Sequence, residues 1–135
     1  MASKQPEPSA VQKPSAVQQG PSAVEKEPSA VQKMIGDFAP KLVELTDNVL
    51  FGDIWERPGL SPRDRSVITV SSLVSLNRTE QLPFHLRRAL DNGVTKDELI
   101  EIITHLAFYA GWPCTMSAIM LAKTVFAEPA YAEHV

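Results

Sequence analysis

The motif Pro-Ser-Ala-Val recurs at residues 8–11, 14–17, 21–24 and 28–31. This spacing of six or seven residues is much shorter than the roughly 20–50 residues of a folded repeat array. Proline removes backbone donors and interrupts helices, and one valine per repeat cannot offset the entropy of ordering the chain. Residues 1–33 are therefore predicted to be a disordered repeat tail, and any folded domain must come from the residues that follow.

The positions of the aromatic residues indicate where a hydrophobic core can form. Every Phe, Trp and Tyr lies between Phe38 and Tyr131. A chain of 135 residues has room for one domain. We therefore predict one domain over residues 34–128, followed by a flexible C-terminus over residues 129–135.

Apolar residues recur at helical spacing through this domain, and strand signals are weak. Ser61, Pro62 and Asp64 form a typical helix start, Thr95 and Glu98 form a capping box, and Gly93 suits a left-handed helix end. The pattern predicts an all-α fold with five helical segments: 37–51, 61–76, 80–90, 95–110 and 114–126. The last segment is apolar on nearly all sides, which suggests burial against another subunit.

Composition excludes several classes of protein. The net charge is −3 without a basic stripe, so we expect no nucleic-acid partner. No run approaches the ~20 apolar residues that cross a bilayer, and the polar N-terminus does not suit a secretory signal, so we expect a cytoplasmic protein with no membrane partner. The single cysteine, Cys114, excludes an internal disulfide and a multi-cysteine metal site.

Four stretches together resemble the carboxymuconolactone decarboxylase family, which includes the alkyl hydroperoxidase D-like proteins. The matching stretches are residues 60–66 (Leu-Ser-Pro-Arg-Asp-Arg-Ser), 85–95 (His-Leu-Arg-Arg-Ala-Leu-Asp-Asn-Gly-Val-Thr), 98–101 (Glu-Leu-Ile-Glu) and 107–113 (Ala-Phe-Tyr-Ala-Gly-Trp-Pro). The resemblance covers residues 36–126. It implies a compact bundle of about five to six helices that assembles into a homo-oligomeric ring, commonly a trimer or a hexamer.

The family divides by chemistry. Its peroxidase-like branch carries Cys-x-x-Cys ahead of the histidine, at the positions of Arg78 and Gln81 here, and an acid at the position of Ser66. Cys114 lies on another segment without a partner thiol. Dithiol peroxide reduction needs an attacking and a resolving sulfur, so a peroxidase is the disfavoured alternative.

The remaining resemblance is to the decarboxylase branch, which implies removal of carbon dioxide from a small carboxylated lactone or related oxo-acid. His85 would be the acid-base residue, since its pKa is ordinarily ~6.5, and Glu80 would assist it. As substrate-binding residues we expect Arg65, which could anchor a carboxylate, together with His105, Tyr109 and Trp112. No organic cofactor and no metal is required.

Other interpretations of these residues stay open. His85 could be a structural histidine, Glu80 could simply favour its helix start, and His105, Tyr109 and Trp112 could be packing residues. We expect Arg87 and Arg88 to form a solvated face. A non-catalytic oligomer that serves in binding or assembly is a further alternative to an enzyme.

Overall fold

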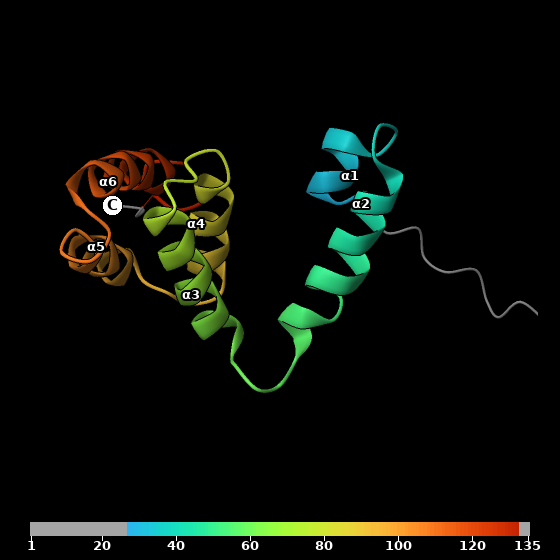
Figure 1. Cartoon of the computed structure of the whole chain (residues 1–135), viewed down its shortest axis with the longest axis horizontal. Coiled ribbons are helices and arrows are strands. Elements are labelled where there is room, and N and C mark those ends of the chain that lie inside the picture. Colours follow the sequence, from blue (N-terminus) through green and yellow to red (C-terminus); the bar gives the residue numbers. More distant parts are fainter. Residues whose placement is uncertain (1–26, 133–135) are drawn as a thin grey trace, which may run out of the picture.

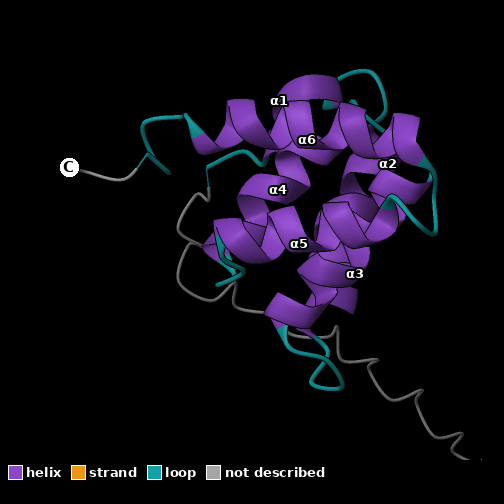
Figure 2. Cartoon of the chain, turned by 90° about the vertical axis from the view of Figure 1, so that its left-hand side faces the viewer, coloured by secondary structure: helices purple, strands orange, loops and turns teal. Residues whose placement is uncertain are grey.

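The computed structural model describes residues 27–132, and within that range every regular element is helical and no strand occurs (Figures 1 and 2). The elements are α1 (Ala30–Ile35), α2 (Pro40–Glu44), η1 (Leu45–Phe51), η2 (Ile54–Glu56), α3 (Pro62–Ser75), α4 (Leu82–Asp91), α5 (Lys96–Leu106) and α6 (Trp112–Phe126). The all-α prediction is confirmed. None of the helices in the described range is long and apolar enough to cross a membrane.

Helices α3 to α6 form a bundle with an apolar core. Each of the four contributes buried side chains: Val70, Val74, Leu82, Leu86, Ala89, Leu99, Ile103, Ala118, Ala122 and Val125. Small residues at 89, 118 and 122 let the backbones of α4 and α6 approach closely, while the leucines fill the space between the helices. The bundle therefore has a closed core of its own, although Ile68, Met116 and Met120 on its surface are exposed.

The ends of the bundle helices follow the local chemistry predicted from the sequence. Ser61 Oγ accepts a hydrogen bond from the Asp64 amide at 3.0 Å at the start of α3. Thr95 and Glu98 exchange side-chain to backbone hydrogen bonds, each 3.1 Å, at the start of α5. Gly93 has a φ of +92° after α4, a conformation in which a side chain would be strained. These three predictions are confirmed.

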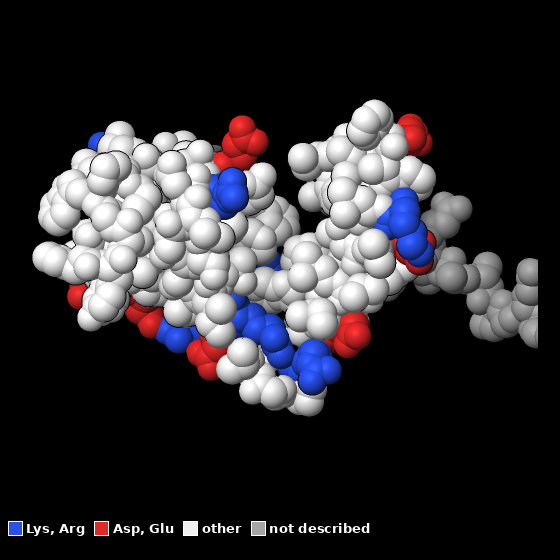
Figure 3. Space-filling model, viewed as in Figure 1, with Lys and Arg blue, Asp and Glu red and all other residues white. Residues whose placement is uncertain are grey.

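Residues 30–51 form a second region, which we call the arm. In it, α1 folds back near α2, and α2 continues into η1, whose turns are π-helical (Figure 1). The arm joins the bundle through η2 and the loop that precedes α3. The space-filling view shows few charged side chains on this face and a hollow between the arm and the bundle (Figure 3).

The arm leaves much of its apolar surface uncovered. Its exposed large side chains are Met34, Phe38, Leu42, Leu45, Val49 and Leu50. Phe38 is the extreme case, with 91% of its surface exposed. Val43 is the one large apolar side chain of the arm that is fully buried within the described residues.

Several boundaries differ from the sequence prediction. Ser29 caps α1, whose first residue is Ala30, so the predicted tail boundary at residue 33 falls inside a helix. The third predicted segment starts at Glu80, whereas α4 starts at Leu82. At the C-terminus, the Tyr131 hydroxyl donates to Asp91 Oδ1 at 3.0 Å, so part of the segment predicted to be flexible packs on α4. Residues 1–26 and 133–135 of the predicted termini lie outside the described range.

Candidate active site

A cavity of about 610 Å³ lies where the arm meets α4. Met34, Leu50 and Phe51 line it from the arm, and Glu80, His85 and Arg88 line it from the start and face of α4. We call it the His85 cavity. Its walls are mostly apolar, while its few ionisable groups gather mainly on the α4 side.

His85 is held among aromatic rings in this cavity. Its imidazole stacks on Trp55, with ring centroids 6.0 Å apart and an angle of 19° between the planes. Phe84 meets it edge-on at 5.0 Å. The Nδ1 atom is buried without a hydrogen-bond partner among the described residues. Burial lowers the pKa of His85 from its ordinary value, and the positive charge of Arg88 lowers it further, so the imidazole of the free protein is neutral at pH 7.

Arg88 lies one helical turn after His85, on the same face of α4. Its guanidinium sits 4.5 Å from the ring centroid of Phe51 and 4.6 Å from that of Trp55. Burial lowers the pKa of Arg88, while Glu56 and Asp91 raise it, and the group keeps its charge. The expectation of a solvated arginine face is therefore wrong for Arg88, because rings from another part of the chain cover it.

Glu80 lies in the turn before α4 and also lines the His85 cavity. Because α4 begins at Leu82, Glu80 is not in the first helical turn as the sequence suggested. It makes no hydrogen bond to His85 in the described structure. The two groups share the cavity, so they can act on one bound molecule from separate positions.

The sequence profile of the carboxymuconolactone decarboxylase family matches residues 40–124, more than half of the chain. The chain belongs to this family. The match starts at α2, so the family domain includes most of the arm as well as the bundle. The α4 wall of the His85 cavity therefore lies within the matched region, whereas its arm wall lies only partly within it, since Met34 and the other α1 residues precede the match.

The chain is similar to two proteins that are named as decarboxylases. It is 39% identical over 94 residues to 4-carboxymuconolactone decarboxylase of Acinetobacter baylyi, which covers 70% of each chain. It is 36% identical over 83 residues to nitrosuccinic acid decarboxylase of Metarhizium robertsii, covering 61% of this chain and 58% of that one. An uncharacterized protein of Paracoccus denitrificans is 31% identical over 80 residues.

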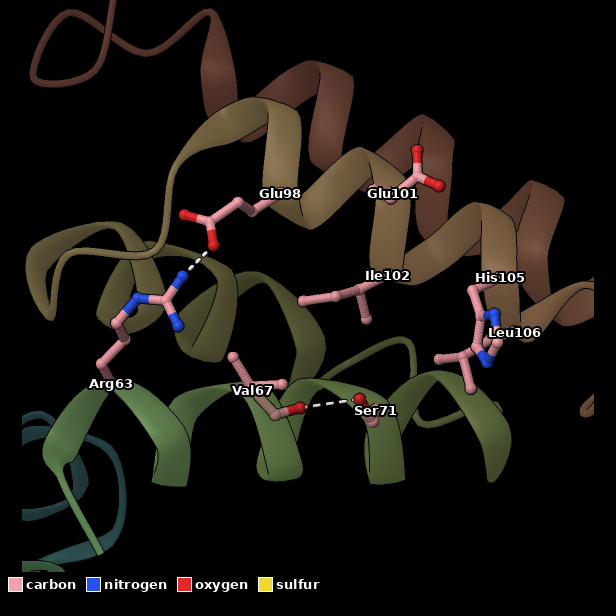
Figure 4. A pocket seen from close by; sticks show the side chains of 8 residues that line it. All are labelled: Arg63, Val67, Ser71, Glu98, Glu101, Ile102, His105 and Leu106. Atoms are coloured by element: carbon pink, nitrogen blue, oxygen red, sulfur yellow. Dashed lines mark hydrogen bonds and ion pairs between the residues drawn. The ribbon is translucent and has the colours of Figure 1, made fainter.

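His105, a substrate-binding candidate predicted from the sequence, lies in a different cavity from His85. This second cavity, of about 500 Å³, runs between α3 and α5 (Figure 4). The ion pair of Arg63 with Glu98 lies at one end, and His105 lies at the other. Val67, Ile102 and Leu106 project into the space between them. His105 also stacks on Tyr109, with centroids 4.9 Å apart.

The other expected substrate-binding residues also lie outside the lining of the His85 cavity. Arg65 donates from Nη2 to the carbonyl oxygen of Arg57 at 3.0 Å, so it ties α3 to the preceding loop. Tyr109 and Trp112 are exposed at the turn between α5 and α6. A single subunit thus brings His85 and Glu80 together and leaves Arg65, His105, Tyr109 and Trp112 elsewhere.

Two further positions bear on the peroxidase alternative. Ser66, at the position of the acid in the peroxidase-like branch, is fully buried and accepts a hydrogen bond from Asn92 Nδ2 at 3.0 Å. The Cys114 thiol donates to the carbonyl oxygen of Gly111 at 3.1 Å at the start of α6. Both residues have structural roles here. The described residues also contain no cluster of three or more His, Cys, Asp or Glu that would suit a metal ion.

Sequence reasoning missed three residues of the site: Arg88, Phe51 and Trp55. A signal for Arg88 was present, because a spacing of three residues from His85 places both on one helix face. Phe51 and Trp55 carry no comparable local signal. Their role depends on how the arm folds against α4, which is a contact between distant parts of the chain.

Proposed function

We propose that the protein is a decarboxylase of a small carboxylated lactone or a related oxo-acid, with His85 as its acid-base residue. The observation that carries the proposal is the placement of His85, Arg88 and Glu80 in one largely apolar cavity. Family membership and the names of the two decarboxylase relatives support the reaction class.

The reaction can be written with residues of this chain alone. The bond between the carboxylate and its carbon breaks, carbon dioxide leaves, and the electron pair moves into a conjugated carbonyl of the substrate. The resulting dienolate then takes a proton at carbon. Because the substrate carbonyl accepts the electrons, the proposed step needs no cofactor. The protein must bind the substrate, favour loss of the charged group and supply the proton.

We assign the proton to His85. In the free protein both causes of its low pKa, burial and the nearby charge of Arg88, keep the imidazole neutral. A bound substrate carboxylate would offset the charge of Arg88 and favour the protonated imidazole. His85 would then be charged when the substrate is present, and the proton could pass to the dienolate carbon. Glu80, on the same cavity wall, would favour this protonated form.

The apolar walls favour loss of a carboxylate. A carboxylate placed against Leu50 and Phe84 is poorly solvated, whereas carbon dioxide is neutral and needs no solvation. The transition state, in which the charge spreads into the ring carbonyl, is therefore stabilised relative to the bound substrate.

The test is release of carbon dioxide from 4-carboxymuconolactone by the purified protein, beside His85→Ala and His105→Ala variants. We expect the His85 variant to lose about 10²–10⁴-fold in kcat, the usual contribution of acid-base catalysis, with an unchanged circular dichroism spectrum. Comparison with the His105 variant tells which cavity holds the reaction. A His85 variant as active as the wild type would refute its role.

We also propose that the protein is a homo-oligomer. The family resemblance implies a ring of subunits, commonly a trimer or a hexamer. The exposed apolar side chains of the arm and of the turn between α5 and α6, such as Phe38 and Trp112, support this. Light scattering on the wild type and on Phe38→Ser measures the oligomeric state, and we expect weaker association in the variant. A wild type that stays monomeric at micromolar concentration would refute the proposal.

A further inference from the structure

The adjacent arginines of α4 have different surroundings. Arg87 forms hydrogen bonds with both carboxylate oxygens of Glu128, at 2.7–3.1 Å. Arg88 makes no ion pair within residues 27–132, and its Nε is buried there without a hydrogen-bond partner. One arginine is thus satisfied by the protein, while its neighbour keeps hydrogen-bonding capacity at the wall of the His85 cavity.

Two aromatic rings fix the position of the Arg88 guanidinium. Phe51 and Trp55 lie 6.0 Å apart by their centroids, and the guanidinium packs over both rings. Packing of this kind is attractive and restricts a long side chain to one place. A planar guanidinium held by its face leaves its edge free, and this edge is the part that binds a carboxylate with two parallel hydrogen bonds.

We propose, on the basis of the proposed function, that Arg88 binds a carboxylate of the substrate that is retained in the product, and that Phe51 and Trp55 position it. The substrate would therefore carry two carboxylates, one that stays on Arg88 and one that leaves. Its apolar body would lie along the wall formed by Leu50 and Phe84.

The choice between the two carboxylates follows from the energetics of decarboxylation. The departing group loses its charge as the bond breaks, so a strong ion pair to it would stabilise the substrate more than the transition state and slow the reaction. A pair with the retained carboxylate has the same strength in both states and contributes to binding alone. Of the two carboxylates, only the retained one can therefore pair with a fixed cation without slowing the loss of carbon dioxide.

Muconolactone is a suitable probe, because it keeps the side-chain carboxylate of 4-carboxymuconolactone and lacks the ring carboxylate. Its methyl ester has nearly the same body without the charge. Calorimetric titration of both compounds would be carried out on the wild type, Arg88→Gln, Arg88→Lys and the neighbouring control Arg87→Gln. Circular dichroism would establish that each variant is folded.

We expect the wild type and Arg87→Gln to bind the acid about tenfold or more tightly than the ester, the size of a charge-assisted pair. Arg88→Gln should bind both compounds equally, and Arg88→Lys should fall between, since an ammonium group lacks the planar pair of donors. For 4-carboxymuconolactone, Arg88→Gln should raise KM and change kcat little.

Several outcomes would contradict the assignment. Preference for the acid that persists in both Arg88 variants would place the anchor elsewhere. A rise in kcat together with the rise in KM would place Arg88 on the departing carboxylate, and a loss in kcat with KM unchanged would place it on the developing dienolate oxygen. A wild type that decarboxylates 4-carboxymuconolactone without binding muconolactone would overturn the Arg88 assignment and leave the proposed function standing, whereas a wild type that does neither would overturn both.

Discussion

The bundle and the arm differ in how they use their apolar residues. In the bundle, Leu86, Leu99 and Ile103 are fully buried among their own helices. In the arm, Phe38 and Leu42 are exposed, and the arm meets the bundle through a few rings around Arg88. The bundle therefore has a core of its own, whereas the position of the arm depends on what it contacts. The His85 cavity lies at the boundary between the two, where a small movement of the arm changes the site.

The sharpest test of this difference compares one leucine from each region. Leu86→Ala removes a fully buried side chain and should lower the free energy of unfolding by about 2–5 kcal/mol. Leu42→Ala removes an arm side chain that is 54% exposed and should cost about 0.5 kcal/mol or less in the separated subunit. Urea denaturation over a range of protein concentrations measures both.

Equal losses in the two variants would contradict the division into a self-contained bundle and a dependent arm. A loss in the Leu42 variant that disappears on dilution would show that a second copy covers this face.

The same division explains what the sequence could predict. The helix starts at Ser61 and Thr95 and the turn at Gly93 depend on neighbouring residues, so they could be predicted. His85 and Glu80 came from the family resemblance. The packing of Phe51 and Trp55 on Arg88 joins residues more than thirty positions apart, and no local pattern indicates it. For the same reason the separation of His105 from His85 became visible only in the fold.

Phe51 tests whether the arm positions the site. Phe51→Ala removes one of the two rings under Arg88 and should weaken muconolactone binding by about tenfold, within the range of a partly buried cation–π contact. The Phe51→Ala and Arg88→Gln double variant should bind no worse than Arg88→Gln alone, because both changes remove one interaction. Calorimetric titration of muconolactone into the wild type, the two single variants and the double variant measures these binding free energies. Additive losses would show that Phe51 contacts the ligand independently of Arg88.

The pKa of His85 depends on its nearness to Arg88 and can be measured without any substrate. The positive charge of Arg88 is one of the two causes that lower this pKa, so Arg88→Gln should raise it while burial still keeps it below its ordinary value. NMR titration of the His85 ring measures the change, and Arg87→Gln is the control. If protonated His85 gives the proton, kcat/KM falls as pH rises through this pKa, and the fall should move to higher pH in Arg88→Gln. A His85 pKa that stays the same or drops in that variant would contradict the contact.

The smallest effect on stability is expected from the ion pair by which the C-terminal residues pack on the bundle. Arg87 and Glu128 are partly exposed, with 42% and 30% of their side-chain surfaces accessible, so water and salt screen the pair. Hydrogen bonding to Arg87 lowers the pKa of Glu128 below its ordinary value of 4.5. A carboxylate whose pKa is lowered by folding stabilises the fold above the unfolded-state pKa and loses this contribution as pH falls through the folded-state pKa.

Arg87→Gln should therefore lower the Tm slightly at pH 7, and the difference from the wild type should vanish in acid, once Glu128 is protonated in both proteins. Differential scanning calorimetry from pH 7 down to below pH 4 measures this convergence. A difference that is the same at every pH would mean that Arg87 stabilises the chain through the packing of its aliphatic stem rather than through its charge. The C-terminal residues would then be held by burial, as the core of the bundle is, rather than by an ion pair.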